Sequence, residues 1–162
     1  MTAATLACIG LGANLGDARG TLERAQQALA RLPGTTLIAA SPVYRTAPID
    51  ATGPDYLNAV ALLRTALEPE ALLGELQRIE QAEGRVRSHR NAPRTLDLDL
   101  LLYGDRRIHT PALVVPHPRL HVRAFVLRPL LDVLPEADIP GLGHASDHLP
   151  SVSNQRIERL VP

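Results

Sequence analysis

The spacing of hydrophobic positions predicts an alternation of strands and helices over the first two thirds of the chain. Four short runs are apolar or alternate in polarity, as strands do, and they span residues 6–11, 37–44, 56–63 and 96–103. Two further segments repeat apolar residues every three or four positions, as amphipathic helices do: Leu22, Ala25, Leu29 and Leu32, then Leu72, Leu73, Leu76 and Ile79. The pattern predicts the order strand, helix, strand, strand, helix, strand.

Proline and glycine predict where the two helices begin and end. Pro33 and Gly34 follow the first helical segment and stop it. Pro69 suits the first turn of the second helix, and Gly84 closes that helix.

The last third of the chain is less regular. Gly104 and Asp105 predict a hairpin turn from the fourth strand into residues 106–109. A proline-rich loop follows, then a short helix at about 125–134 and a weakly patterned tail. The βαββαβ order with these appended elements is typical of one α+β domain over residues 1–162. We expect a ferredoxin-like sandwich, in which helices pack on one face of an antiparallel sheet.

Composition and charge restrict the kinds of protein that fit this pattern. With 162 residues, 45% of them hydrophobic, the chain is long enough for one domain with a full core. Its formal net charge is zero, so its overall field attracts neither nucleic acid nor a membrane surface. We therefore expect neither as a partner.

The single cysteine, Cys8, lies in the first apolar run. One cysteine cannot form an intrachain disulfide and fits a reducing compartment, and its apolar neighbours predict a core position. The first 12 residues lack the charged region of a signal peptide, and no apolar run approaches the roughly 18 residues of a membrane span. We therefore expect a cytoplasmic protein.

Two aspartates alternate with leucines in the fourth predicted strand. Because successive side chains of a strand point to opposite faces, Asp97 and Asp99 share one face and the leucines between them share the other. Two carboxylates this close repel unless a cation lies between them or one of them takes up a proton. The pair is either the solvated face of a half-buried strand or a site for a divalent metal.

The run just before this strand favours the metal site. Within residues 85–94 there is no acidic residue but there are four arginines, Arg85, Arg87, Arg90 and Arg94. Guanidinium groups match the geometry of phosphates, and carboxylates bind metal ions. Together they predict a site for a metal-bound polyphosphate.

Aromatic residues are rare, and two of them are candidates for ligand contact. Tyr56 and Phe125 either fill the core or sandwich a flat heteroaromatic ligand, since offset stacking favours such a pair. Asn58 lies two residues after Tyr56 and therefore on the same strand face. Its carboxamide carries donors and an acceptor, which suits the edge of a base-like ring.

Glycines cluster after the first strand, in the segment Gly-Leu-Gly-Ala-Asn-Leu-Gly at residues 10–16. The spacing is close to the dinucleotide-binding fingerprint, but the third glycine falls one residue late. We interpret the segment as a strand-to-helix turn, in which Asn14 and the backbone are candidates for lining a ligand pocket.

Polar residues also lie near the second proline cluster. His117 stands between two prolines, and Arg123 follows shortly after. A lone histidine in a loop is more often a surface residue than a ligand. The six histidines show no metal-ligand spacing, so we expect no zinc site.

Eight short elements in the chain combine into one recognisable pattern. The most specific is Ala-Pro-Arg-Thr-Leu-Asp-Leu-Asp-Leu-Leu at residues 92–101. The other seven lie in order at residues 12–16, 44–49, 55–59, 77–80, 84–87, 115–118 and 123–125. Together they closely resemble the hydroxymethyldihydropterin pyrophosphokinase family of folate biosynthesis, over about residues 5–135.

The resemblance implies a reaction and its cofactors. Family members transfer the β,γ-pyrophosphoryl group of ATP to the hydroxymethyl group of 6-hydroxymethyl-7,8-dihydropterin, which gives AMP and the pterin diphosphate. Carried over, Asp97 and Asp99 hold two Mg²⁺ ions, and Arg85 and Arg94 complete the catalytic group by neutralising phosphates. The implied partners are ATP and the pterin, and we expect a monomer.

The resemblance also implies which residues bind each substrate. On the ATP side it implies Gln77, Glu80, Arg85, Arg94, Leu100, His117 and Arg123, with Leu100 at the adenine. On the pterin side it implies Tyr56 and Phe125 on the ring faces, and Thr46, Pro48, Ile49 and Asn58 at the ring edge. The physical interpretation agrees, because phosphoryl transfer depends mainly on positioning and charge neutralisation.

Two alternatives use the same residues differently. The first is a non-catalytic ferredoxin-like module that binds nucleotides or RNA. Zero net charge and few aromatic residues count against it, since such sheets display stacking rings beside basic tracts. The second is a metal-dependent nuclease, which needs further carboxylates near the aspartate pair, and the preceding loop offers none.

Overall fold

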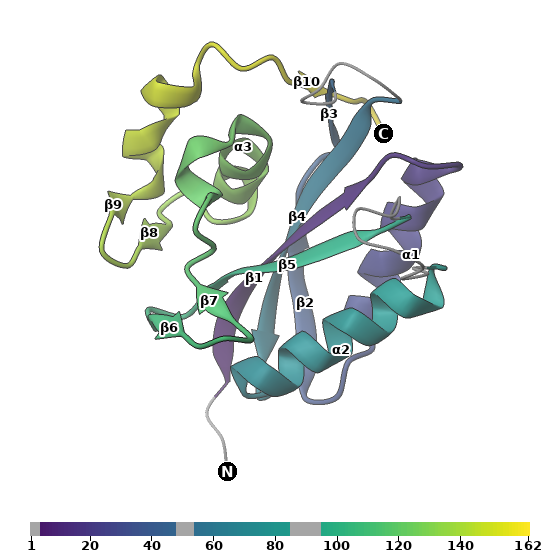
Figure 1. Ribbon diagram of the computed structural model, residues 1–162, viewed down its shortest axis with the longest axis vertical. Helices are drawn as coiled ribbons and strands as arrows, with labels where there is room; N and C mark the ends of the chain where they lie inside the picture. The colour runs from purple at the N-terminus through teal and green to yellow at the C-terminus, as the bar shows by residue number, and fades with distance from the viewer. Residues whose placement is uncertain (1–3, 48–53, 85–94) are drawn as a thin grey trace.

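A six-stranded antiparallel sheet runs through the centre of the molecule in the computed structural model, which describes residues 4–47, 54–84 and 95–162 (Figure 1). The strands are β1 (Thr5–Ala13), β2 (Thr35–Ala40), β3 (Tyr44–Thr46), β4 (Tyr56–Thr65), β5 (Asp97–Tyr103) and β10 (Glu158–Arg159). β4 pairs with β1 on one side and with both β2 and β3 on the other. β5 adds to the outer side of β1, and β10 adds to β3.

Two helices, α1 (Ala18–Ala30) and α2 (Pro69–Ala82), cover one face of this sheet (Figure 1). Both were predicted from their apolar stripes. Those stripes pack against strand residues that share one face of the sheet: Ile9, Leu11, Ala61, Leu63, Leu98 and Leu100. Removing this apolar surface from water is the main stabilising contribution to the fold on this side.

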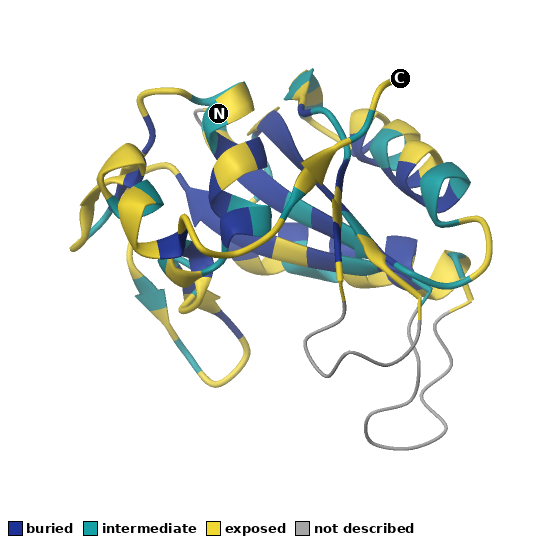
Figure 2. Cartoon of the chain, turned by 90° about the horizontal axis from the view of Figure 1, so that it is seen from above, coloured by how far each residue is buried: buried dark blue, intermediate teal, exposed yellow. Residues whose placement is uncertain are grey.

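The opposite face is covered by α3 (Ala124–Val133) and the 3₁₀ helices η1 (Leu120–Val122) and η2 (Ala145–Val152). The prediction that helices pack on one face of the sheet is therefore incomplete, because helices cover both faces. β4 is apolar at successive positions from Ala59 to Leu63, so both of its faces need cover. Figure 2 shows the buried residues gathered in the strands and on the inner sides of the helices.

The strand predicted at 37–44 is wrong as a single strand, because β2 ends at Ala40 and β3 begins at Tyr44. Pro42 lies in the gap and has no N–H to donate to a neighbouring strand. Ser41 bridges the break: its N–H donates to the Val60 carbonyl (2.9 Å), and its Oγ accepts from the Val60 N–H (2.9 Å).

The hairpin predicted after β5 is also wrong. β6 (Ile108–His109) pairs with β7 (Val114–Val115) instead of folding back on β5. The N–H of Gly104 donates to the Leu6 carbonyl (2.7 Å), so the end of β5 remains joined to β1. A third small element pairs β8 (Asp138–Ile139) with β9 (Gly143–His144).

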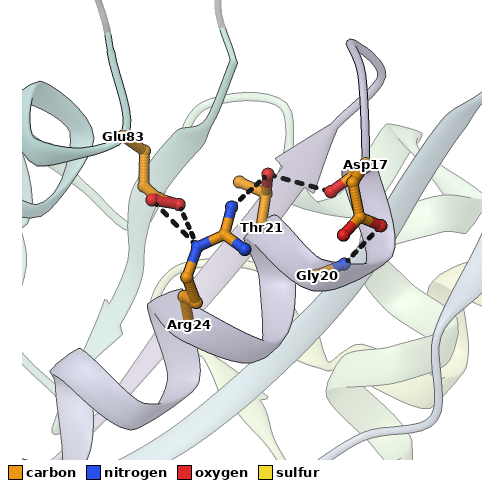
Figure 3. A network of polar contacts seen from close by, with 5 residues as sticks. All are labelled: Asp17, Gly20, Thr21, Arg24 and Glu83. Atoms are coloured by element: carbon orange, nitrogen blue, oxygen red, sulfur yellow. Dashed lines mark hydrogen bonds and ion pairs between the residues drawn. The ribbon is translucent and has the colours of Figure 1, made fainter.

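A polar network joins the start of α1 to the end of α2 (Figure 3). Asp17 caps α1 by accepting from the N–H of Gly20 (3.1 Å), and a Cβ at Gly20 would stand only 2.2 Å from Asp17 Oδ2. Thr21 Oγ1 donates to the Asp17 carbonyl (3.0 Å) and accepts from Arg24. Arg24 Nε in turn donates to the Glu83 carboxylate (2.8 Å) at the end of α2.

None of the helices in the described ranges has the length and apolar character needed to cross a lipid bilayer.

Cys8 is predicted to be chemically inert in the folded protein. Its side chain is 1% exposed in the core under α3, and burial raises the pKa of its thiol to about 12. A disulfide reagent at pH 8 should leave the native protein unlabelled and should label one thiol per chain in denaturant. Stoichiometric labelling of the native protein would contradict the core position.

Candidate functional site

A cavity of about 510 Å³ opens on the face of the sheet that α3 covers. Strands β1, β4 and β5 supply its base, and the start of α3 supplies one wall. Eight residues singled out from the sequence line this one cavity: Thr46, Tyr56, Asn58, Asp97, Asp99, His117, Arg123 and Phe125.

Two glycines of β1 form part of the cavity base. Gly12 pairs with Asn58 of β4 on one side and with Asp97 of β5 on the other, and Gly10 pairs with Asp99 in the same way. A Cβ at Gly12 would lie 3.3 Å from Asn58 Oδ1. The missing side chain at Gly12 therefore leaves space above β1 with polar groups on both sides of it, whereas the Leu101 side chain packs over Gly10, 3.4 Å from where a Cβ would lie.

The interpretation of residues 10–16 as a turn is thus wrong for its first half, because β1 continues to Ala13. The sequence did contain a signal for a strand with an open face. Two glycines two residues apart in an apolar strand lie on the same face and put no side chains on it. Asn14 does not line the cavity, and its Nδ2 donates to the Pro54 carbonyl (3.5 Å).

The aspartate pair lies as the alternation predicted. Asp97 and Asp99 both face the cavity, Asp99 exposed and Asp97 half-buried. Leu98 and Leu100 point to the opposite side and join the core under α1 and α2. The two carboxylates therefore share one edge of the cavity.

A β-bulge follows the pair and places His117. Leu100 pairs with Ile9 and Leu102 pairs with Cys8, so Leu101 has no partner on β1. The Leu101 carbonyl accepts the N–H of His117 (3.0 Å). The histidine loop is thereby joined to the strand that carries the carboxylates.

His117 and Arg123 contribute hydrogen-bond donors to the same cavity. Burial lowers the pKa of His117; Asp99 opposes this shift, and the guanidinium groups of Arg123 and Arg119 add to it. His117 Nδ1 accepts from the Arg119 N–H (3.1 Å), so the neutral ring carries its proton on Nε2. Burial also lowers the pKa of Arg123, which remains a cation because arginine titrates far above neutral pH.

The aromatic residues and the amide lie away from the carboxylates, on the β4 and α3 walls. Tyr56 is 37% exposed at the start of β4, and Phe125 lies in the first turn of α3, with the Arg123 Cζ 5.4 Å from its ring centroid. Asn58 is buried, and its Nδ2 donates to Thr46 Oγ1 (3.1 Å). That bond orients the carboxamide with Oδ1 beside Gly12.

Three residues expected on the ATP side do not line this cavity. Gln77 is exposed on α2, and Leu100 is buried on the other face of the sheet. Glu80 is 4% exposed under α2. Their roles at a nucleotide stay predictions.

Glu80 instead supports the strand that carries the aspartates. Among the described residues β5 is an edge strand, and no strand of these ranges pairs with its outward N–H groups. Glu80 Oε2 accepts the N–H of Leu98 (2.8 Å), the residue between Asp97 and Asp99. A charged residue on the apolar stripe of a helix was the signal for such a buried contact, because Glu80 lies one turn beyond Leu76.

Several of the expected residues fall outside the described ranges. They are Pro48 and Ile49 on the pterin side and Arg85, Arg87, Arg90 and Arg94 in the arginine run. Their assignments stay predictions.

Comparison with known proteins gives a consistent result. The family model described as 7,8-dihydro-6-hydroxymethylpterin-pyrophosphokinase (HPPK) matches residues 8–135. A 2-amino-4-hydroxy-6-hydroxymethyldihydropteridine pyrophosphokinase from Pseudomonas aeruginosa is 44% identical over 153 residues, which cover 94% of both chains. The enzyme of the same name from Haemophilus influenzae is 39% identical over 96% of this chain and 98% of its own.

The fold is also similar to a solved structure. A Plasmodium falciparum HPPK-DHPS crystal structure with pteroate superposes with a TM-score of 0.76 at 13% identity, over 99% of this chain. This chain spans 48% of that longer chain. At this identity the likeness shows the fold alone.

Replacing Glu80 should destabilise the fold at β5. In Glu80→Ala the buried Leu98 N–H loses its acceptor, which should cost about 1–3 kcal/mol. Glu80→Gln keeps an acceptor oxygen and should lose less. Urea unfolding measures both, with the exposed Gln81→Ala on the same helix as the control. An unfolding midpoint for Glu80→Ala equal to that of the control would contradict the assignment.

Proposed function

Because the chain belongs to the 7,8-dihydro-6-hydroxymethylpterin-pyrophosphokinase family, we propose that it transfers pyrophosphate from ATP to the hydroxymethyl group of 6-hydroxymethyl-7,8-dihydropterin by a two-Mg²⁺ mechanism. Family membership alone makes it a pyrophosphokinase of folate biosynthesis. The observation that supports the finer proposal is that one and the same cavity has carboxylates at one edge and aromatic rings on its other walls.

The pterin occupies the part of the cavity between Tyr56 and Phe125. A flat bicyclic ring stacks on both faces there, because offset aromatic contact is favourable and the glycine base of β1 leaves room. The Asn58 carboxamide, held by Thr46, offers an acceptor and a donor to the ring edge. The family pattern also assigns Pro48 and Ile49 to the pterin.

The polyphosphate of ATP occupies the part beside β5. Asp97 and Asp99 present oxygen ligands, which suit Mg²⁺ because it is commonly held by one or two carboxylates together with substrate phosphates. These residues would hold the two ions. When bound, Mg²⁺ neutralises charge on the phosphates.

The chain's own donors orient the same phosphates. Arg123 offers a guanidinium group, and the neutral His117 offers its Nε2 proton to a phosphate oxygen. Arg85 and Arg94 add positive charge from the arginine run. Gln77, Glu80 and Leu100 are assigned to the nucleotide side by the family pattern, and Glu80 acts there through β5.

We also assign the fold to the ferredoxin-like class. The strand order, with β2 and β3 beside β4, then β1 and β5, supports this assignment together with the two crossover helices on one face.

One incubation tests the proposed reaction. The protein is mixed with ATP, Mg²⁺ and the reduced pterin, and the nucleotide products are separated. We expect one AMP per pterin diphosphate and no ADP. ADP would indicate an ordinary kinase, and the absence of any turnover would favour the non-catalytic binding module.

Removing either carboxylate should abolish most of the activity. Asp97→Ala and Asp99→Ala each lose a ligand to the phosphate-bound cation, so turnover should fall by about 10²–10³-fold or more. Circular dichroism should show an unchanged fold. Asp105→Ala, an exposed aspartate in the turn after β5, is the matched control and should turn over normally. Near-normal rates in both cavity variants would contradict the two-metal assignment.

Adding a methyl group at Gly12 should weaken pterin binding. In Gly12→Ala the new Cβ presses on Asn58 Oδ1 and narrows the base of the cavity, so the KM for the pterin should rise about tenfold. The KM for ATP should change little. Gly74→Ala on α2, where a Cβ meets nothing within 4 Å, is the control and should leave both constants unchanged. Equal changes in the two KM values would contradict a role at the pterin.

A further inference from the structure

We infer that Gln155, in the C-terminal segment beyond the family-matched residues 8–135, is a positioning residue for Arg123 and Phe125. Its side-chain amide bridges the two peptide groups on either side of Arg123. The kinetic part of this inference rests on the proposed function.

The bridge uses both ends of one carboxamide. Gln155 Oε1 accepts the N–H of Ala124 (2.9 Å), and Gln155 Nε2 donates to the Val122 carbonyl (2.9 Å). The residue between these two peptide groups is Arg123, and Phe125 is the residue after Ala124. Both of these side chains line the cavity.

The first turn of α3 lacks a cap of its own. Arg123 occupies the N-cap position, and its side chain makes no capping bond because a guanidinium group has no acceptor atom. The first N–H groups of a helix need an acceptor from outside the helix. Gln155, 31 residues further along the chain, provides one of them.

Gln155 is itself held on both sides. Val152 before it is 3% exposed in the core under α3, and the Gln155 N–H donates to the Val152 carbonyl (3.0 Å). After it, β10 pairs with β3, and the Leu160 N–H donates to the Val43 carbonyl (2.8 Å). The bridge is therefore anchored to the sheet although the Gln155 side chain is exposed.

The other end of α3 is fixed independently. The Tyr44 hydroxyl in β3 donates to the carboxylate of Asp132 in the last turn of the helix. Loss of the Gln155 bridge should therefore loosen the first turn and leave the rest of α3 in place. Small displacements of groups that orient substrates have large effects on rate.

Hydrogen exchange tests the bridge without any assay of activity. Gln155→Met keeps the length of the side chain and removes both hydrogen bonds, so peptides that contain Ala124 should exchange about tenfold faster. Peptides from the last turn of α3 should exchange as in the unmodified protein. Asn154→Ala, at the neighbouring exposed residue, is the control and should leave the exchange rates of both sets of peptides unchanged. Unchanged exchange at Ala124 in Gln155→Met would overturn the bridge.

Steady-state kinetics test its consequence. Gln155→Met should lower kcat and raise the KM for the pterin, each by about threefold to tenfold. Gln155→Glu keeps the acceptor for Ala124 but puts a carboxylate oxygen in place of the donor to the Val122 carbonyl, so it should recover only part of the loss. A role in packing alone predicts full recovery, because Glu has the size and shape of Gln. Faster exchange with unchanged kinetics would overturn the positioning role. If the unmodified protein makes no AMP, the proposed function fails, and the exchange result still decides the bridge.

Discussion

The register of β1 between β4 and β5 is the constraint on which the site depends. It sets Gly12 between Asn58 and Asp97 and aligns Gly10 with Asp99, so the groups proposed for the pterin and for the phosphates stand on opposite sides of a strip without side chains. A slip of β1 by one residue would turn Leu11 into that strip, and the same slip in β5 would bury the aspartates under α2. The apolar residues on the other face of β1 prevent this slip, because they pack under α1 and α2.

Local pattern predicted the two sheet-covering helices and the aspartate face, because both depend only on the period of a helix or a strand. α1, α2 and the shared face of Asp97 and Asp99 therefore agree with the sequence-based prediction. The break between β2 and β3 was visible as Pro42, but its repair by Ser41 depends on Val60, 19 residues away. Contacts of that range leave no periodic signal.

The supporting contacts of the site were the part that sequence reasoning missed, since it named Glu80 only for the nucleotide and did not name Gln155. Glu80 acts through the Leu98 N–H, and Gln155 acts through the peptide groups around Arg123. Both side chains bond to backbone groups of their partners. Because every residue type has a backbone, the residue type of the partner does not reveal such a contact. The position of Glu80 on an apolar stripe was a usable hint, whereas exposed Gln155 offered none.

These supports also explain how a site assembled from so many separate segments can keep its shape. The cavity draws side chains from β3, β4, β5, the histidine loop and the first turn of α3. The Leu101 carbonyl holds the histidine loop, Glu80 holds the edge strand, and the C-terminal segment holds the start of α3. Each of these bonds ends on the backbone of a site residue or of its neighbour, so none of them uses a donor or acceptor of the side chains that face the cavity. Such preorganisation is what a reaction based on charge neutralisation requires, since donors already in place need no rearrangement during the reaction.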